Sequence, residues 1–160
     1  MIYTKTITEA HGGNVSSPTQ RKFPVSSGLI FRVEFYFPPG SSGLLHVWVK
    51  DGGFQIWPSE PGETFFGDNT VIAFDDMYYV AAADHNLDVY SYNLDDRYNH
   101  VFQVRIGQVN DPMFIASKLP SLTTENWENV IAEILAKQDM SYEAQRARVI
   151  EQAEQAEELE

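Results

Sequence analysis

The sequence predicts a mainly β fold: an antiparallel β-sandwich of jelly-roll type, with an α-helical extension toward the C-terminus. Three observations support this prediction: a segment in which apolar and polar residues alternate, a series of short apolar runs separated by turn residues, and a change to a helical period after Asp111. Strand side chains point alternately to the two faces of a sheet, whereas neighbours on a helix recur every three or four residues. With 160 residues, the chain suits one compact domain and an appendage.

The alternating segment runs from Leu29 to Phe37. Its apolar residues occupy every second position: Leu29, Phe31, Val33, Phe35 and Phe37. Arg32 and Glu34 lie between them and are expected to face solvent. We therefore expect the five apolar side chains to face the core of the sandwich.

The residues before this strand lack a comparable pattern. A short strand is possible at Ile2 to Thr8, but the stretch from His11 to Pro24 is rich in Gly, Ser, Asn, Thr and Pro and has no hydrophobic period. Such a composition is typical of irregular structure. We expect residues 1–28 to form an N-terminal arm outside the sandwich.

Short apolar runs recur after the alternating strand and make residues 29–110 the predicted body. They predict strands at Leu44 to Lys50, Phe54 to Trp57, Thr70 to Phe74, Tyr78 to Ala83, Leu87 to Asn93 and His100 to Val109. Asp51-Gly52-Gly53 separates the first two, and these residue types favour the tight turn of a β-hairpin. Seven or eight short strands separated by turns are typical of a sandwich.

The C-terminal part of the chain predicts helices. Residues 111–140 are expected to form a linker and an amphipathic helix docked on the body through Trp127, Val130, Ile131, Ile134 and Leu135. A second, acidic helix is expected at residues 141–160, starting at Ser141. Its stripe of Tyr142, Val149, Ala153 and Ala156 is too thin to hold a helix on a core, so we expect this tail to bind partner chains or other copies.

Charge and composition exclude several classes of function. The net charge of −12 repels phosphate backbones and anionic membranes, so we expect neither nucleic-acid nor membrane binding. The chain has no cysteine, which removes disulfides and thiolate chemistry. No apolar run approaches the length of a membrane span, and the first ten residues lack the apolar core of a signal peptide. We therefore expect synthesis in the cytoplasm without secretion.

No pattern indicates catalysis or metal binding. The four histidines, His11, His46, His85 and His100, lack the close spacing that metal ligands commonly show. Carboxylates such as Glu60 and Asp76 have no spacing that indicates a catalytic pair, and no serine lies in a nucleophile elbow. We expect no catalytic residue, no metal and no cofactor, and a protein that is not an enzyme.

Four aromatic residues are candidates for a ligand site or an interface: Trp48, Trp57, Tyr90 and Tyr92. Exposed tryptophan and tyrosine rings stack on sugars, so a carbohydrate- or receptor-binding module is one interpretation. The other is packing in the core or against another subunit, because both faces of the strand from Leu44 to Lys50 are largely apolar. Two solvent-facing tryptophans would favour the first interpretation, and burial would favour the second.

One resemblance covers about half of the chain, from Val33 to Val109. It rests on Phe37-Pro38-Pro39-Gly40, Gly43-Leu44-Leu45-His46-Val47, Asp51-Gly52-Gly53-Phe54-Gln55-Ile56-Trp57-Pro58-Ser59, Gly62-Glu63 and Phe66-Gly67-Asp68-Asn69. In these turns and strands the chain resembles small β-rich virion proteins of tailed bacteriophages, in particular capsid decoration proteins. The resemblance implies a structural role in the virion, with the major capsid protein, other virion proteins or further copies of the chain as partners. The long acidic C-terminal extension departs from that pattern.

Overall fold

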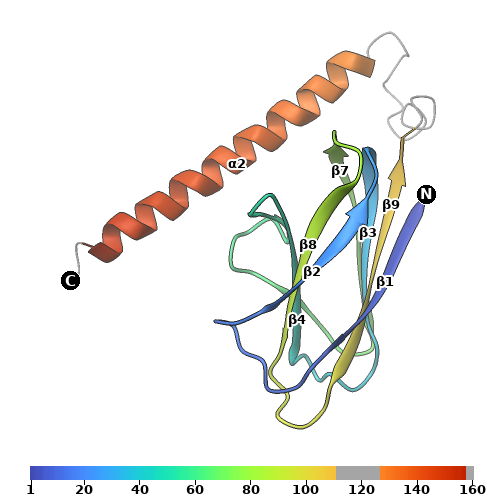
Figure 1. The fold of residues 1–160 in the computed structure, drawn as a ribbon, viewed down its shortest axis with the longest axis vertical. Helices are drawn as coiled ribbons and strands as arrows, with labels where there is room; N and C mark the ends of the chain where they lie inside the picture. The colour runs from blue at the N-terminus through green and yellow to red at the C-terminus, as the bar shows by residue number, and fades with distance from the viewer. Residues whose placement is uncertain (111–126, 158–160) are drawn as a thin grey trace.

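The computed structural model describes residues 1–110 and 127–157, and shows two antiparallel sheets packed face to face with one long helix beside them (Figure 1). Sheet A contains, in spatial order, β1 (Ile2–Glu9), β9 (His100–Val109), β3 (Gly28–Phe37) and β7 (Thr70–Val80). Sheet B contains β2 (Thr19–Val25), β8 (His85–Asn93), β4 (Leu45–Asp51) and β5 (Phe54–Trp57), and the short β6 (Phe65–Phe66) pairs with β4. The helix is α2 (Trp127–Glu157). The predicted fold class is confirmed.

The strand pairing has the nested order of a jelly roll. β1 pairs with β9, β2 with β8, β3 with β7 and β4 with β5, so the first half of the sandwich folds back on the second. Such a nested hairpin, rolled into two sheets, is how a jelly roll limits its open edges. The turn of the innermost hairpin lies at the predicted place, since Asp51 is opposite Phe54 and both Gly52 and Gly53 have positive φ.

The core between the sheets is built from alternate residues of the central strands. Val33, Phe35 and Phe37 of β3 are completely buried, as predicted. Leu45, Val47 and Val49 of β4, and Phe102, Val104 and Ile106 of β9, are also completely buried. Arg32 and Glu34 lie on the opposite face of β3 and form an ion pair with an N–O distance of 3.3 Å.

A β-bulge changes the direction of the first residues of β3. The register with both β7 and β9 shifts between Ile30 and Arg32, which makes Phe31 the extra residue on β3 relative to β9. As a result, Ile30 joins the central core, Leu29 is buried in a separate cluster with Ile134 of α2, and Phe31 is half-buried. The prediction that Leu29 and Phe31 face the sandwich core is therefore wrong.

The N-terminal segment is part of the sandwich. β1 pairs with β9 along its whole length, and β2 pairs with β8. Buried Glu9 joins the two sheets: it accepts hydrogen bonds from Thr19 and Ser91 and forms an ion pair with Arg21 at 2.5 Å. The predicted arm at residues 1–28 is therefore wrong.

Two further boundaries differ from the prediction. β7 is one strand, where the sequence suggested two, because Asp75 and Asp76 lie within it beside the bulge of β3. α2 continues through Ser141, so the predicted start of a second helix there is also wrong. No helix in the described ranges, residues 1–110 and 127–157, is long and apolar enough to span a membrane.

Candidate functional site

The outer face of sheet B carries a row of aromatic rings. Leu45, Val47 and Val49 point into the core, so the intervening His46 and Trp48 lie on the outer face of β4. The register places Tyr92 of β8 beside His46 and Tyr90 beside Trp48. Phe66 of β6 pairs with His46 on the other side. We call Phe66, His46, Tyr92, Trp48 and Tyr90 the aromatic row.

The rings of the aromatic row pack on one another. His46 stacks on Tyr92 with a centroid distance of 4.6 Å and an interplanar angle of 12°, and Trp48 stacks on Tyr90 at 5.3 Å and 13°. The ring of Trp48 meets that of Tyr92 edge-on, with a centroid distance of 5.9 Å, and the ring centroids of Phe66 and His46 lie 5.1 Å apart. The rings thus occupy much of one another's faces, which are the surfaces that a sugar ring would need for stacking.

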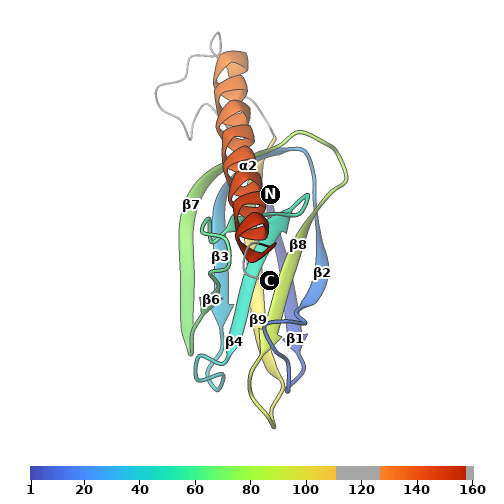
Figure 2. The same ribbon diagram turned by 90° about the vertical axis from the view of Figure 1, so that its left-hand side faces the viewer.

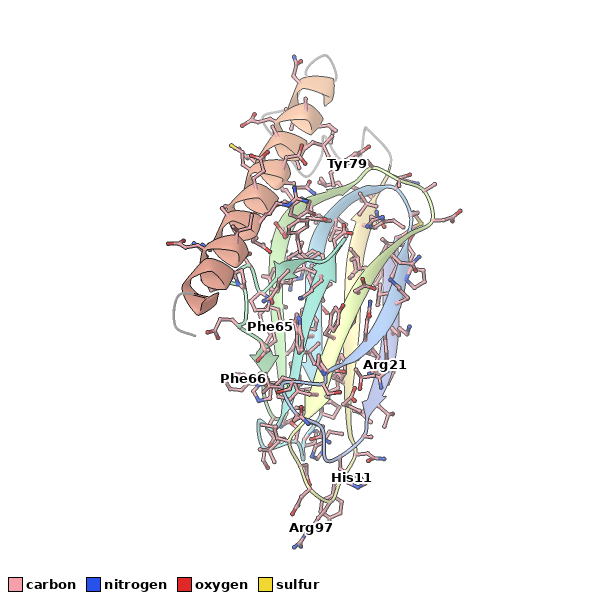
Figure 3. The ribbon with its side chains drawn as sticks, turned by 60° about the vertical axis from the view of Figure 1, so that its left-hand side comes forward. His11, Arg21, Phe65, Phe66, Tyr79 and Arg97 are labelled. Carbon is pink, nitrogen blue, oxygen red and sulfur yellow. The ribbon has the colours of Figure 1, made fainter. Side chains whose placement is uncertain are left out.

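The side chains of the aromatic row differ in exposure. Phe66 is 55% exposed at one end, Tyr92 is buried, and His46, Trp48 and Tyr90 are half-buried. Figure 3 shows Phe66 at the margin of the body, below the lower end of α2. Burial lowers the pKa of His46, whose Nδ1 lies 2.8 Å from the hydroxyl of Thr64. The aromatic row is therefore mostly neutral and apolar, and it is exposed mainly at the end formed by Phe66.

Trp57 lies apart from the aromatic row. It is only 2% exposed, contacts Phe74 and Tyr78 edge-on in the core, and donates a hydrogen bond from Nε1 to Asp76 at 2.6 Å. Of the four predicted aromatics, Trp48, Tyr90 and Tyr92 come together and Trp57 does not. His46 and Phe66 were missed, because only the strand register reveals that they extend the row.

The predicted docking face of α2 contacts the body in part. Val130, Ile131 and Ile134 pack around Leu29, with Tyr79 and Val109 beside them, at the ends of β3, β7 and β9. Leu135 is half-buried and lies outside this cluster. The side chain of Trp127 is outside the described residues. Figure 2 shows α2 running from this end of the sheets along the body toward β4.

Tyr142, predicted to bind a partner chain, contacts the body of its own chain instead. Its ring stacks on Phe54 at 4.7 Å, and its hydroxyl shares a hydrogen bond with that of Tyr78. Tyr78 also donates to Asp51 at 2.5 Å, and His85 Nε2 lies 2.8 Å from the same carboxylate. Burial is the main cause of the raised pKa of both tyrosines. The side chains of Val149, Ala153 and Ala156, the rest of the predicted tail stripe, lie outside the described residues.

Two glutamines of α2 bind the backbone of two sheet edges. The backbone N–H of Tyr79 in β7 donates to Gln138 Oε1 at 3.1 Å, and Gln138 Nε2 donates back to the Tyr79 carbonyl at 3.4 Å. Gln145 makes the same pair of bonds with the backbone of Gln55 in β5, at 3.1 and 2.7 Å. Seven residues separate the glutamines, which places them on one helix face. Sequence reasoning missed them because polar residues within an apolar stripe give no sign of their partners.

The cavity beside α2 does not have the residues of a recognisable reactive centre. A cavity of about 720 Å³ lies between α2 and the strand ends, lined by Leu29, Phe31, Met77, Ile134, Lys137 and others. Within residues 1–110 and 127–157 there is no group of three or more His, Asp or Glu residues placed to hold a metal ion. The four histidines contact separate partners, namely Asn99, Thr64, Asp51 and Asp95. Compared with protein-family models and with curated protein sequences, the chain matches none.

Proposed function

We propose that this chain is a non-enzymatic structural protein of a virion, a capsid decoration or minor capsid protein that binds neighbouring virion proteins through the aromatic row. The observation that carries the proposal is the mutual stacking of the row. Rings locked against one another form a preorganised apolar surface, and rigid aromatic anchors lose little entropy when a partner covers them. Repetition on a symmetric shell adds avidity, so each contact needs only modest affinity.

The stacking also supports the structural role over the carbohydrate-binding alternative. A sugar platform needs an open aromatic face, but Trp48 lies flat on Tyr90 and against the edge of Tyr92. The second tryptophan that such a site would use, Trp57, is buried in the core. Phe66, the most exposed member of the row, has no polar group with which to orient a sugar.

The virion setting comes from the resemblance in the turns and strands between Val33 and Val109. On this basis we propose that the chain is made in the host cytoplasm and that the major capsid protein, or another virion protein, binds the aromatic row. The net charge of −12 suits attachment to a basic partner surface and gives the encounter a salt dependence.

Two measurements test this proposal. Mass spectrometry of purified particles should find the chain at a stoichiometry that reflects shell symmetry; particles that lack it contradict the virion role. Particles assembled without the chain should then take up the added recombinant protein. The double variant Trp48→Ala with Phe66→Ala should occupy fewer sites on the particles. The control variant Val101→Ala, on the outer face of sheet A, should have the occupancy of the wild-type chain. Equal occupancy of both variants contradicts the role of the row, and glycan binding that is lost in Trp48→Ala would support the alternative.

A further inference from the structure

The sandwich has four sheet edges, and they differ in how they are protected. β1 and β7 bound sheet A. Sheet B is bounded by β2 on one side and by β5 with the two-residue β6 on the other. An edge strand presents a row of unpaired backbone N–H and C=O groups that another chain can pair with. Natural proteins protect such edges with charged residues, proline, bulges or a covering element.

Three of the four edges carry such protection. β1 and β2 lie beside each other, and Lys5 of β1 donates to the carbonyl of Lys22 in β2 at 2.6 Å. β2 also contains Arg21 and Pro24, and proline has no N–H to offer. β5 is covered by α2 through Gln145.

β7 is protected along only half of its length. Its second half is bound by α2, through Gln138 on the backbone of Tyr79. The first half, residues 70–74, pairs with β3 on one side, and no described strand pairs with it on the other (Figure 2). Its sequence is Thr-Val-Ile-Ala-Phe, without charge, proline or glycine. Such segments pair readily with other strands.

The side chains of this half-strand are also incompletely covered. Val71 is 50% exposed on the outer face, and Ala73 beside it is exposed. Ile72 and Phe74 point toward the core but are only partly buried, together with Phe65 of β6. An added strand beside β7 would therefore bury apolar side chains as well as satisfy backbone groups.

We propose that residues 70–74 of β7 pair with the same residues of a second copy of this chain, antiparallel and about a two-fold axis. With Ile72 on the axis, Thr70 lies opposite Phe74 and Val71 opposite Ala73, so each cross-strand pair is apolar or β-branched, a combination that stabilises sheets. The segment is thus its own complement and forms the isologous contact that two-fold dimers require. The two four-stranded sheets A then become one continuous sheet.

The flanking residues limit this contact to about five residues per copy. In the proposed register Asp76 would face Asp68 of the second copy, and like charges placed opposite each other are unfavourable. The net charge of −12 on each copy adds a longer-range repulsion. Dimerisation should therefore be weak at low salt and become stronger as salt screens the charge, which is the reverse of attachment to a basic surface. This inference does not depend on the aromatic row.

The test is sedimentation velocity of the full chain over a range of protein and salt concentrations. We expect a monomer–dimer equilibrium that shifts toward dimer with salt. Val71→Lys with Ala73→Lys places like charges opposite each other twice per dimer and should weaken dimerisation about tenfold or more. The matched control is Val101→Lys with Gln103→Lys, on β9 of the same sheet, which is paired on both sides.

A charge swap makes the test specific to this register. Mixing the double lysine variant with Val71→Glu/Ala73→Glu should restore a heterodimer, because each lysine then faces a glutamate. A chain that stays monomeric at high concentration and high salt overturns the proposal. So does a dimer that the β7 variants leave intact, since it must then form through another surface such as the aromatic row.

Discussion

The outer faces of the two sheets differ in the side chains that their central strands place side by side. On sheet A, Arg32 pairs with Glu34 and Asp75, and Arg105 pairs with Glu34. On sheet B, the corresponding cross-strand neighbours are the stacked rings of the aromatic row. Both arrangements satisfy a strand whose other face is buried, but only the charged one is suited to remain in water. This contrast is the reason why we propose the outer face of sheet B as the face that binds a partner.

The largest effect should come from the core that both faces share. Phe35→Ala deletes a completely buried ring beside Phe65 and should lower the free energy of unfolding by about 3 to 5 kcal/mol. Glu34→Ala, the adjacent residue on the charged face, should change it by about 0.5 kcal/mol or less. Denaturant unfolding measures both. Similar losses in the two variants would contradict the assignment of inner and outer faces in β3.

An intermediate effect should separate the two outer faces directly. Trp48→Ala removes a ring stacked on Tyr90 and should cost about 1 to 2 kcal/mol, since an aromatic pair adds to the burial of its area. Arg105→Ala on sheet A removes a half-exposed ion pair with Glu34 and should cost about 0.5 kcal/mol or less, a loss that salt reduces further. Chemical unfolding at low and high salt checks both values. A salt-sensitive loss at Trp48 would show that its role is not apolar packing.

The sequence predicts the sandwich well wherever a single strand carries its own signal. Val33, Phe35 and Phe37 alternate with polar residues, and Asp51-Gly52 requires a turn, so the inner face of β3 from Val33 onward and the innermost hairpin could be predicted from local patterns. β2 escaped prediction, and the possible strand at Ile2 to Thr8, which is β1, was expected outside the sandwich. Both are edge strands with few buried residues, notably Ile7, Phe23 and Val25.

Contacts between distant segments explain the remaining differences. The bulge at Phe31 depends on the register of β3 with both of its neighbours, which the alternation of one strand does not contain. Tyr142 binds Tyr78, 64 residues away, and Gln145 binds Gln55, 90 residues away. The aromatic row was found in part, since Trp48, Tyr90 and Tyr92 stand out as residue types. His46 joins the row only once β4 and β8 are aligned.

The smallest effect concerns His46, the one ring of the aromatic row that titrates near neutral pH. Burial lowers the pKa of His46 below its ordinary value of 6.5, so the unfolded chain binds a proton more readily than the folded one. The stability that neutral His46 contributes is therefore complete above pH 6.5 and is lost as the pH falls through 6.5 toward the lowered value. His46→Phe keeps a ring between Phe66 and Tyr92 but cannot titrate.

The melting temperature should therefore fall more steeply between pH 7.5 and pH 5 for the wild-type chain than for His46→Phe. Loss of the contact with Thr64 shifts the melting temperature of the variant equally at every pH. We therefore compare the slopes of melting temperature against pH and not the melting temperatures themselves. Equal slopes for wild type and His46→Phe would mean that His46 is as well solvated in the folded chain as in the unfolded one. The aromatic row would then be more open than its packing indicates, and the contrast between the two outer faces would be correspondingly smaller.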